Sequence, residues 1–101
     1  MTMFGGIFMS DLPFRQRCLR HMIKNLPVLR SKLEISQSQL AEKLGVTRQT
    51  ITAIECGARP LSWTTFLALC FLFDSSPATR PLMELYEICP PELRAELTQF
   101  P

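Results

Sequence analysis

Residues 37–56 read QSQLAEKLGVTRQTITAIEC and predict two short helices joined by a tight turn. Ser36 and Gln39 have the spacing of a capping box, in which each side chain bonds the backbone N–H of the other residue. The first helix is therefore expected to open at Ser36. Gly45 should end it, because glycine adopts the left-handed backbone conformation at little cost.

The second helix is expected to be capped by Thr47, to run to about Cys56 and to stop at Gly57. Ala41 is small, which suits a close crossing of the two helices. Apolar side chains would fill the wedge between them: Leu40, Leu44, Val46, Ile51 and Ile54. The two helices should thus form one rigid unit.

The second helix has one apolar side and one polar side. At about 100° of rotation per residue, Ile51 and Ile54 share the buried side. The exposed side near the start of the helix carries Thr47, Arg48, Gln49, Thr52 and Ala53. Arginine can bridge two acceptors of guanine, glutamine can bond adenine, and methyl groups can contact thymine. This surface has no acidic group and suits the reading of DNA bases.

Residues 26–73 resemble the helix-turn-helix domain of the lambda repressor and Cro type, the xenobiotic-response-element regulators of bacteria and phages. The residues that carry the resemblance are Leu29-Arg30, Ser36-Gln37, the run from Leu40 to Ile51, Ile54-Glu55 and Gly57. The resemblance implies that the second motif helix lies in the major groove while the first crosses the phosphate backbone.

The resemblance also implies a role for each matching position. Base reading falls to Arg48, Gln49, Thr52 and Thr47. Phosphate contact falls to Ser36, Gln37, Thr50 and Arg59. Arg30 and Glu55 match a structural pair that ties an earlier helix to the end of the recognition helix.

Four positions depart from the family pattern. Glu34 stands where the family usually has glycine, so the turn before the motif is expected to differ. Ala53 replaces a residue that is often long and polar, which removes one base reader. Cys56 and Ala58 replace residues that are commonly Asn and Lys, which thins the phosphate contacts.

The whole chain has 101 residues, of which 47% are hydrophobic, enough for one small packed domain. We expect an all-α fold: a compact lambda-repressor-like domain of five to six helices, with an added N-terminal helix and short C-terminal helices. The expected divisions are a flexible tail (1–10), a basic helix (11–25), the DNA-binding domain (26–74) and a helical extension that is the candidate dimer interface (75–101).

Helical signals outside the motif set further expectations. Asp11 would cap a first helix that runs to about Lys24, and Asn25 would cap a separate second helix with Pro27 in its first turn. The segment 62–73 is apolar on nearly all sides, which is typical of a helix buried within the domain or against a second subunit. Two short helices should follow, 81–88 with Leu82, Leu85 and Ile88 inward, and 91–100 with Leu93, Leu97 and Phe100 inward.

Charge is distributed unevenly along the chain. The net charge is +2, but residues 10–33 hold six basic residues against Asp11 alone, a balance of +5. Residues 61–101 hold two basic and five acidic residues, a balance of −3. This polarity favours an anionic partner near the first third of the chain. The acidic last third is not expected to face DNA.

Other classes of protein find little support. No apolar run reaches the roughly 18–20 residues of a membrane span, and the apolar start lacks the marks of a signal peptide. Cys18, Cys56, Cys70 and Cys89 are widely spaced, so we expect buried, reduced thiols of a cytoplasmic protein and no metal site. We also expect no enzymatic activity, cofactor or small-molecule ligand.

The sequence therefore predicts a sequence-specific transcriptional regulator, acting as a repressor and binding a double-stranded DNA operator as a homodimer. The alternative is an antitoxin-like or other protein-interaction module that uses the same fold to hold a partner protein. A C-terminal helix that becomes ordered only with a partner would favour this alternative.

Overall fold

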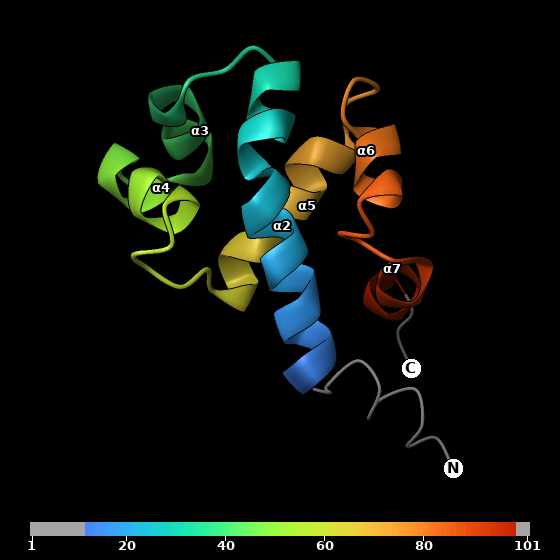
Figure 1. Ribbon diagram of the computed structural model, residues 1–101. Coiled ribbons are helices and arrows are strands. Elements are labelled where there is room, and N and C mark those ends of the chain that lie inside the picture. Colours follow the sequence, from blue (N-terminus) through green and yellow to red (C-terminus); the bar gives the residue numbers. More distant parts are fainter. Residues whose placement is uncertain (1–11, 99–101) are drawn as a thin grey trace.

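The computed structural model describes residues 12–98, and within them the chain is all-helical, as predicted. The helices are α2 (Leu12–Lys32), α3 (Gln37–Leu44), α4 (Arg48–Glu55), α5 (Trp63–Asp74), α6 (Arg80–Leu85) and α7 (Pro91–Thr98). Helix α2 runs through the middle, with α3 and α4 on one side and α6 and α7 on the other (Figure 1). The expected tail, the Asp11 cap and the side chains of Leu97 and Phe100 lie outside the described residues.

The prediction of two separate helices before residue 33 is wrong, because α2 is continuous through Pro27. Its buried stripe has a regular spacing and consists of Phe14, Cys18, Met22, Leu26 and Leu29. Asn25 caps no new helix, and its Nδ2 instead donates to the carbonyl oxygen of His21, one turn earlier. A proline within a helix costs roughly 3 kcal/mol. Each large apolar side chain that the straight helix buries contributes about 1.5–3 kcal/mol, so packing outweighs the local break.

The helix boundaries of the motif are confirmed by their caps. Ser36 Oγ accepts from Gln39 N at 3.1 Å, and Gln39 Oε1 accepts from Ser36 N at 2.8 Å, which completes the capping box. Gly45 follows α3 with a φ of 75°, in the left-handed region. Thr47 caps α4 through its hydroxyl, and Gly57 lies just beyond α4 with a φ of 81°. These local signals fix the length and direction of both motif helices.

Glu34 adopts the left-handed conformation that glycine would take, with a φ of 55°. The turn before the motif therefore keeps a positive φ despite the substitution, and the expected change of turn does not occur. Backbone hydrogen bonds close the turn, from Glu34 N to the carbonyl oxygen of Ser31 at 2.9 Å and from Ile35 N to that of Arg30 at 3.2 Å. The left-handed backbone of Glu34 thus carries a conformational cost that glycine would not have.

Replacing Glu34 with glycine should stabilise the protein. We expect the free energy of unfolding to rise by about 0.5–1 kcal/mol, since relief of the left-handed strain exceeds the added entropy of the unfolded chain. Urea unfolding followed by circular dichroism measures it. Glu42→Gly, within α3, is the control and should lower stability by about 1 kcal/mol. A loss of stability in both variants would contradict the argument.

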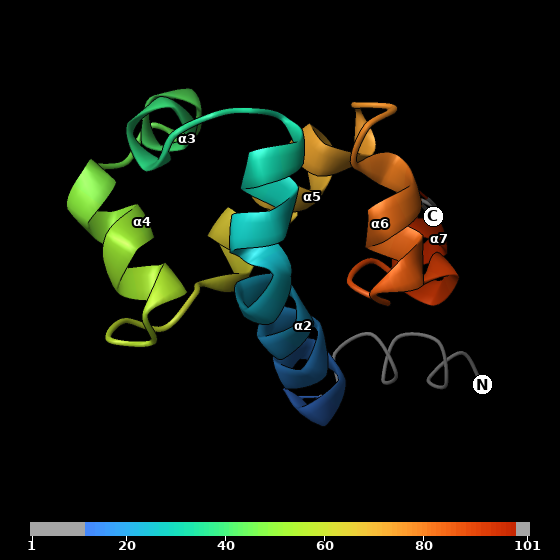
Figure 2. The ribbon, with the colours of Figure 1, turned by 45° about the horizontal axis from the view of Figure 1, so that its top comes forward.

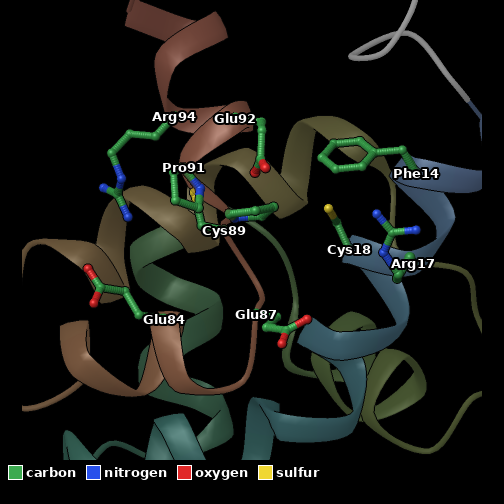
Figure 3. A pocket seen from close by; sticks show the side chains of 10 residues that line it. Phe14, Arg17, Cys18, Glu84, Glu87, Cys89, Pro91, Glu92 and Arg94 are labelled. Atoms are coloured by element: carbon green, nitrogen blue, oxygen red, sulfur yellow. The ribbon is translucent and has the colours of Figure 1, made fainter.

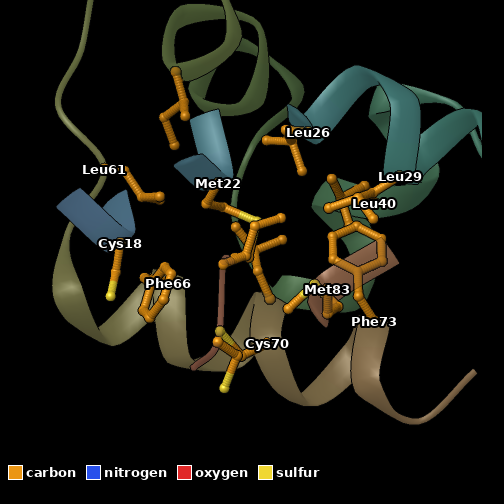
Figure 4. Packing of buried hydrophobic residues seen from close by; sticks show 14 of the residues in the cluster. Cys18, Met22, Leu26, Leu29, Leu40, Leu61, Phe66, Cys70, Phe73 and Met83 are labelled. Carbon is orange, nitrogen blue, oxygen red and sulfur yellow. The ribbon is translucent and has the colours of Figure 1, made fainter. Parts of the chain in front are cut away.

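The core lies where α2, α3, α4 and α5 meet, and residues of α6 and α7 extend it (Figure 4). Helix α5 contributes Phe66, Leu69, Cys70 and Phe73. It is not buried on all sides, however, because 78% of Phe71 is exposed. Within one chain the helix is therefore not enclosed at this position, and its burial against a second subunit stays a prediction.

Helix α6 ends earlier than predicted and presents a different face. Leu85, predicted to point inward, is 70% exposed, whereas Met83 is fully buried. The inward positions are Thr79 and Met83, four residues apart, and Thr79 Oγ1 donates to the carbonyl oxygen of Phe73 at 2.6 Å. The turn at Glu87, with a φ of 53°, then brings Ile88 into the core as predicted.

Three of the four cysteines are buried, as predicted, but Cys56 is exposed. It lies at the C-terminal cap of α4, where the chain leaves the helix, so no other element covers it. Within the described residues no helix is long and apolar enough to cross a bilayer.

Candidate nucleic-acid interface

Helix α4 presents a polar surface that the rest of the fold leaves uncovered. Ile51 is fully buried and Ile54 is 2% exposed, so these two side chains hold the helix against the core. Arg48, Gln49 and Thr52 are exposed on the other side. Figure 2 shows α4 at the edge of the molecule, with α3 beside it and α6 and α7 far away. The helix is therefore open along its polar side.

Three of the residues singled out from the sequence meet at the start of α4. Thr47 Oγ1 accepts from Thr50 N at 3.2 Å and lies 3.0 Å from Thr50 Oγ1. Arg59, in the loop after α4, donates from Nη1 to Thr50 Oγ1 at 3.2 Å. All three side chains are anchored to one another at the protein surface, with the guanidinium beside the helix that carries Arg48.

Gln37 connects the two motif helices, a contact that the sequence analysis missed. Its Oε1 accepts from Thr52 Oγ1 at 2.8 Å, and its Nε2 donates to Glu55 Oε1 at 2.9 Å. Thr52 and Glu55 are three residues apart on α4, which places them on neighbouring positions of one helix face. The three-residue spacing of Thr52 and Glu55 was the signal in the sequence that could have predicted this contact. The amide of Gln37 thus fixes the angle between α3 and α4.

Arg30 and Glu55 form the pair that the resemblance implied. Arg30 Nε donates to Glu55 Oε2 at 3.0 Å, and Arg30 Nη2 donates to Oε1 at 3.2 Å, which is a two-pronged contact. Arg30 also donates from Nη1 to the carbonyl oxygen of Ile35. Only 9% of the Glu55 side chain and 20% of the Arg30 side chain are exposed. The pair joins α2 to the end of α4.

Ser36 is engaged by its capping box, but its hydroxyl keeps its own hydrogen to donate. Its hydroxyl accepts from Gln39, and its backbone N–H is bonded to the side chain of Gln39. The exposed backbone N–H groups of the first turn of α3 lie next to it. Ser36 therefore positions the start of α3, where those N–H groups can meet an anion.

Arg48 and Gln49 differ from all these residues. Among the described residues neither side chain takes part in a hydrogen bond or an ion pair. Their donors and acceptors face solvent at the centre of the polar surface of α4.

A family model for the helix-turn-helix domain matches residues 25–83, more than half of the chain. The chain belongs to the helix-turn-helix domain family. Neither the comparison with curated proteins nor the comparison with solved structures yields a match. Helix-turn-helix domains are DNA-binding folds, and α3 and α4 are the two helices of the motif here.

The matched helix-turn-helix region begins inside α2 and ends inside α6. It therefore includes Arg30, the connection through Glu34, both motif helices and all of α5. The first half of α2 and the whole of α7 lie outside it.

Proposed function

We propose that this helix-turn-helix protein is a sequence-specific transcriptional regulator of the lambda repressor and Cro type, and that α4 reads the major groove. The observation that carries the proposal is the open polar side of α4. Arg48 and Gln49 are exposed and uncommitted there, with Thr52 and Thr47 beside them. These side chains match the acceptors and donors of guanine and adenine in the major groove.

The residues around α4 are suited to hold the DNA backbone. Arg59 and Thr50 form one contact group at the start of α4, and the N-terminus of α3 with Ser36 and Gln37 forms another. Phosphate contacts of this kind set the register of a protein on the duplex but carry no sequence information. Gln37 would reach a phosphate with donor capacity that its bonds to α4 leave over.

We further propose that the protein acts as a homodimer on a palindromic operator and represses transcription by occupying promoter DNA. Phe71 and Leu85 support a self-association surface, because they are large apolar side chains exposed on α5 and α6. These helices pack against each other. In such a dimer the two recognition helices would lie about 34 Å apart, one turn of DNA.

Selection of bound fragments from a random DNA pool tests the proposal directly. We expect enrichment of an inverted repeat whose half-sites are about 10 base pairs apart, centre to centre. Light scattering of the protein alone and with the selected site should show two chains. A pool without enrichment would overturn sequence-specific binding, and enrichment of a single half-site by one chain would overturn the dimer.

Arg59→Ala should weaken binding to all DNA sequences to a similar degree. Without the guanidinium of Arg59, binding to DNA releases about one counterion fewer. The slope of log K against log salt concentration should therefore become shallower by about 1. Anisotropy titrations on the selected site and on a scrambled site, at four salt concentrations, measure both effects. A loss confined to the selected site would instead assign Arg59 to base reading.

A further inference from the structure

The side-chain amide of Gln37 has an orientation that its neighbours dictate. Its Nε2 donates to Glu55 Oε1 at 2.9 Å, and its Oε1 accepts from Thr52 Oγ1 at 2.8 Å. The two ends of the amide are not interchangeable, because the Glu55 carboxylate only accepts hydrogen bonds and can face only the NH2 group. Arg30 holds that carboxylate with two donors of its own. The oxygen of the amide is thereby turned toward Thr52.

The hydroxyl group of Thr52 is committed by this orientation to one direction of hydrogen bonding. A hydroxyl has one hydrogen to donate and two lone pairs that accept. The hydrogen is donated to Gln37 Oε1, which has none to give in return. Thr52 is exposed, so its lone pairs remain open to a molecule that approaches α4. Toward such a molecule Thr52 accepts hydrogen bonds and does not donate them.

Thr52 differs in this respect from Arg48 and Gln49, its neighbours on the polar side of α4. Among the described residues neither of these two side chains takes part in a hydrogen bond or an ion pair. The amide of Gln49 is therefore able to turn and present either its oxygen or its NH2 group to a base. Arg48 has donors only, whatever its surroundings. Of the three side chains, only Thr52 has a hydrogen-bonding direction that contacts within the fold determine.

We propose that Thr52 selects a base with an exocyclic amino group, adenine or cytosine, at one base pair of the DNA site, and that Gln37 is the positioning residue that enforces this choice. The inference rests on the proposed binding of α4 in the major groove. There adenine N6 and cytosine N4 carry donors, whereas guanine O6 and thymine O4 are acceptors. An amino group would donate to the free lone pair of Thr52. A carbonyl oxygen in its place would face that lone pair with no hydrogen between them.

Rotation of the Thr52 hydroxyl would not remove this choice without a loss. If its hydrogen turned toward a carbonyl oxygen of a base, Gln37 Oε1 would lose its donor in an interface from which bound DNA excludes water. The amide of Gln37 cannot turn over to compensate, because its oxygen would then face the carboxylate of Glu55. We therefore expect guanine or thymine at this position to weaken binding about 5- to 10-fold.

Anisotropy titrations of the full chain, on the selected site and on all its single-base-pair variants, measure the preference. Thr52→Val removes the hydroxyl but keeps the shape of the side chain, so the base pair at which this variant loses discrimination is the one that Thr52 reads. The unaltered protein should prefer adenine or cytosine there, and the matched control Thr52→Ser, which keeps the hydroxyl, should retain that preference. A preference for guanine or thymine, or a Thr52→Val variant with unchanged selectivity, would overturn the proposal and leave sequence-specific binding standing.

Gln37→Met tests the positioning role. Methionine has a similar length but no amide, so the hydroxyl of Thr52 becomes free to donate as well as accept. The ratio of affinities for the amino-bearing and the carbonyl-bearing bases should approach unity, even if a lost phosphate contact lowers the affinity for every site alike. Gln16→Met places the same substitution on an exposed position of α2 and should leave the ratio unchanged. An unaltered ratio in Gln37→Met would show that Gln37 does not enforce the choice.

NMR spectroscopy of the free protein tests the orientation of the amide without DNA. Nuclear Overhauser contacts should connect the amide protons of Gln37 to the side chain of Glu55 and not to the methyl group of Thr52. The reverse pattern would show that the amide is turned over, which overturns this inference while binding by α4 can still hold. A random pool that yields no enriched DNA site would instead overturn the proposed function and the choice of base together.

Discussion

Arg48→Ala and Gln49→Ala should each weaken binding to the selected operator by about 1–3 kcal/mol, which is roughly 5- to 150-fold. Both side chains are exposed at the centre of the polar side of α4 and have no partner among the described residues, so truncation costs the fold nothing. In the complex each is expected to make two hydrogen bonds to one base. Removing a two-pronged contact also relaxes the preference at that base pair.

Anisotropy titrations with the selected site and with sites altered at single base pairs measure this effect. Each variant should lose discrimination at one position of each half-site and retain it elsewhere. Arg80→Ala and Gln16→Ala are matched controls, since both residues are exposed, Arg80 at the start of α6 and Gln16 in the first half of α2. The proposed reading surface is incorrect if the α4 variants bind with the affinity and selectivity of these controls.

Arg30→Met should lower the free energy of unfolding by about 3 kcal/mol. Methionine keeps much of the length and apolar contact of the arginine stem but removes both hydrogen bonds to Glu55. The carboxylate of Glu55, 9% exposed, then retains only the bond from Gln37. A nearly buried charge without its counter-charge is costly, which makes this the largest expected effect of one substitution on stability.

The double variant Arg30→Met with Glu55→Leu distinguishes loss of the pair from loss of packing. Removing both charges should recover most of the lost stability, because no buried charge remains. Arg20→Met places the same substitution on an exposed position of α2 and should change stability by less than about 0.5 kcal/mol. Equal losses for Arg20→Met and Arg30→Met in urea unfolding would show that the ion pair does not tie α2 to α4.

Signals within a few residues of one another predicted the motif well. The capping box at Ser36, the left-handed glycine at Gly45 and the cap at Thr47 each depend on bonds inside one turn of chain. The spacing of Ile51 and Ile54 likewise determines which side of α4 faces outward. The family resemblance supplied the Arg30–Glu55 pair, whose partners are 25 residues apart and have no local signature.

The errors arose where packing opposes a local signal. Asn25 and Pro27 are a typical helix start, yet α2 passes through them because a straight helix buries one continuous stripe. At Glu34 a non-glycine residue adopts the left-handed conformation that favours glycine. Leu85 was predicted to point inward but is exposed, since the path of α6 decides its environment.

Local chemistry along the chain thus predicted the two motif helices and the polar side of α4, because hydrogen bonds and helical periodicity act over short distances. Tertiary packing alone brought Gln37 onto Thr52 and Glu55, and brought Cys18 and Cys89 to the wall of one pocket (Figure 3). Such contacts join residues far apart in the chain. They exist only once burial of apolar surface has brought the helices together.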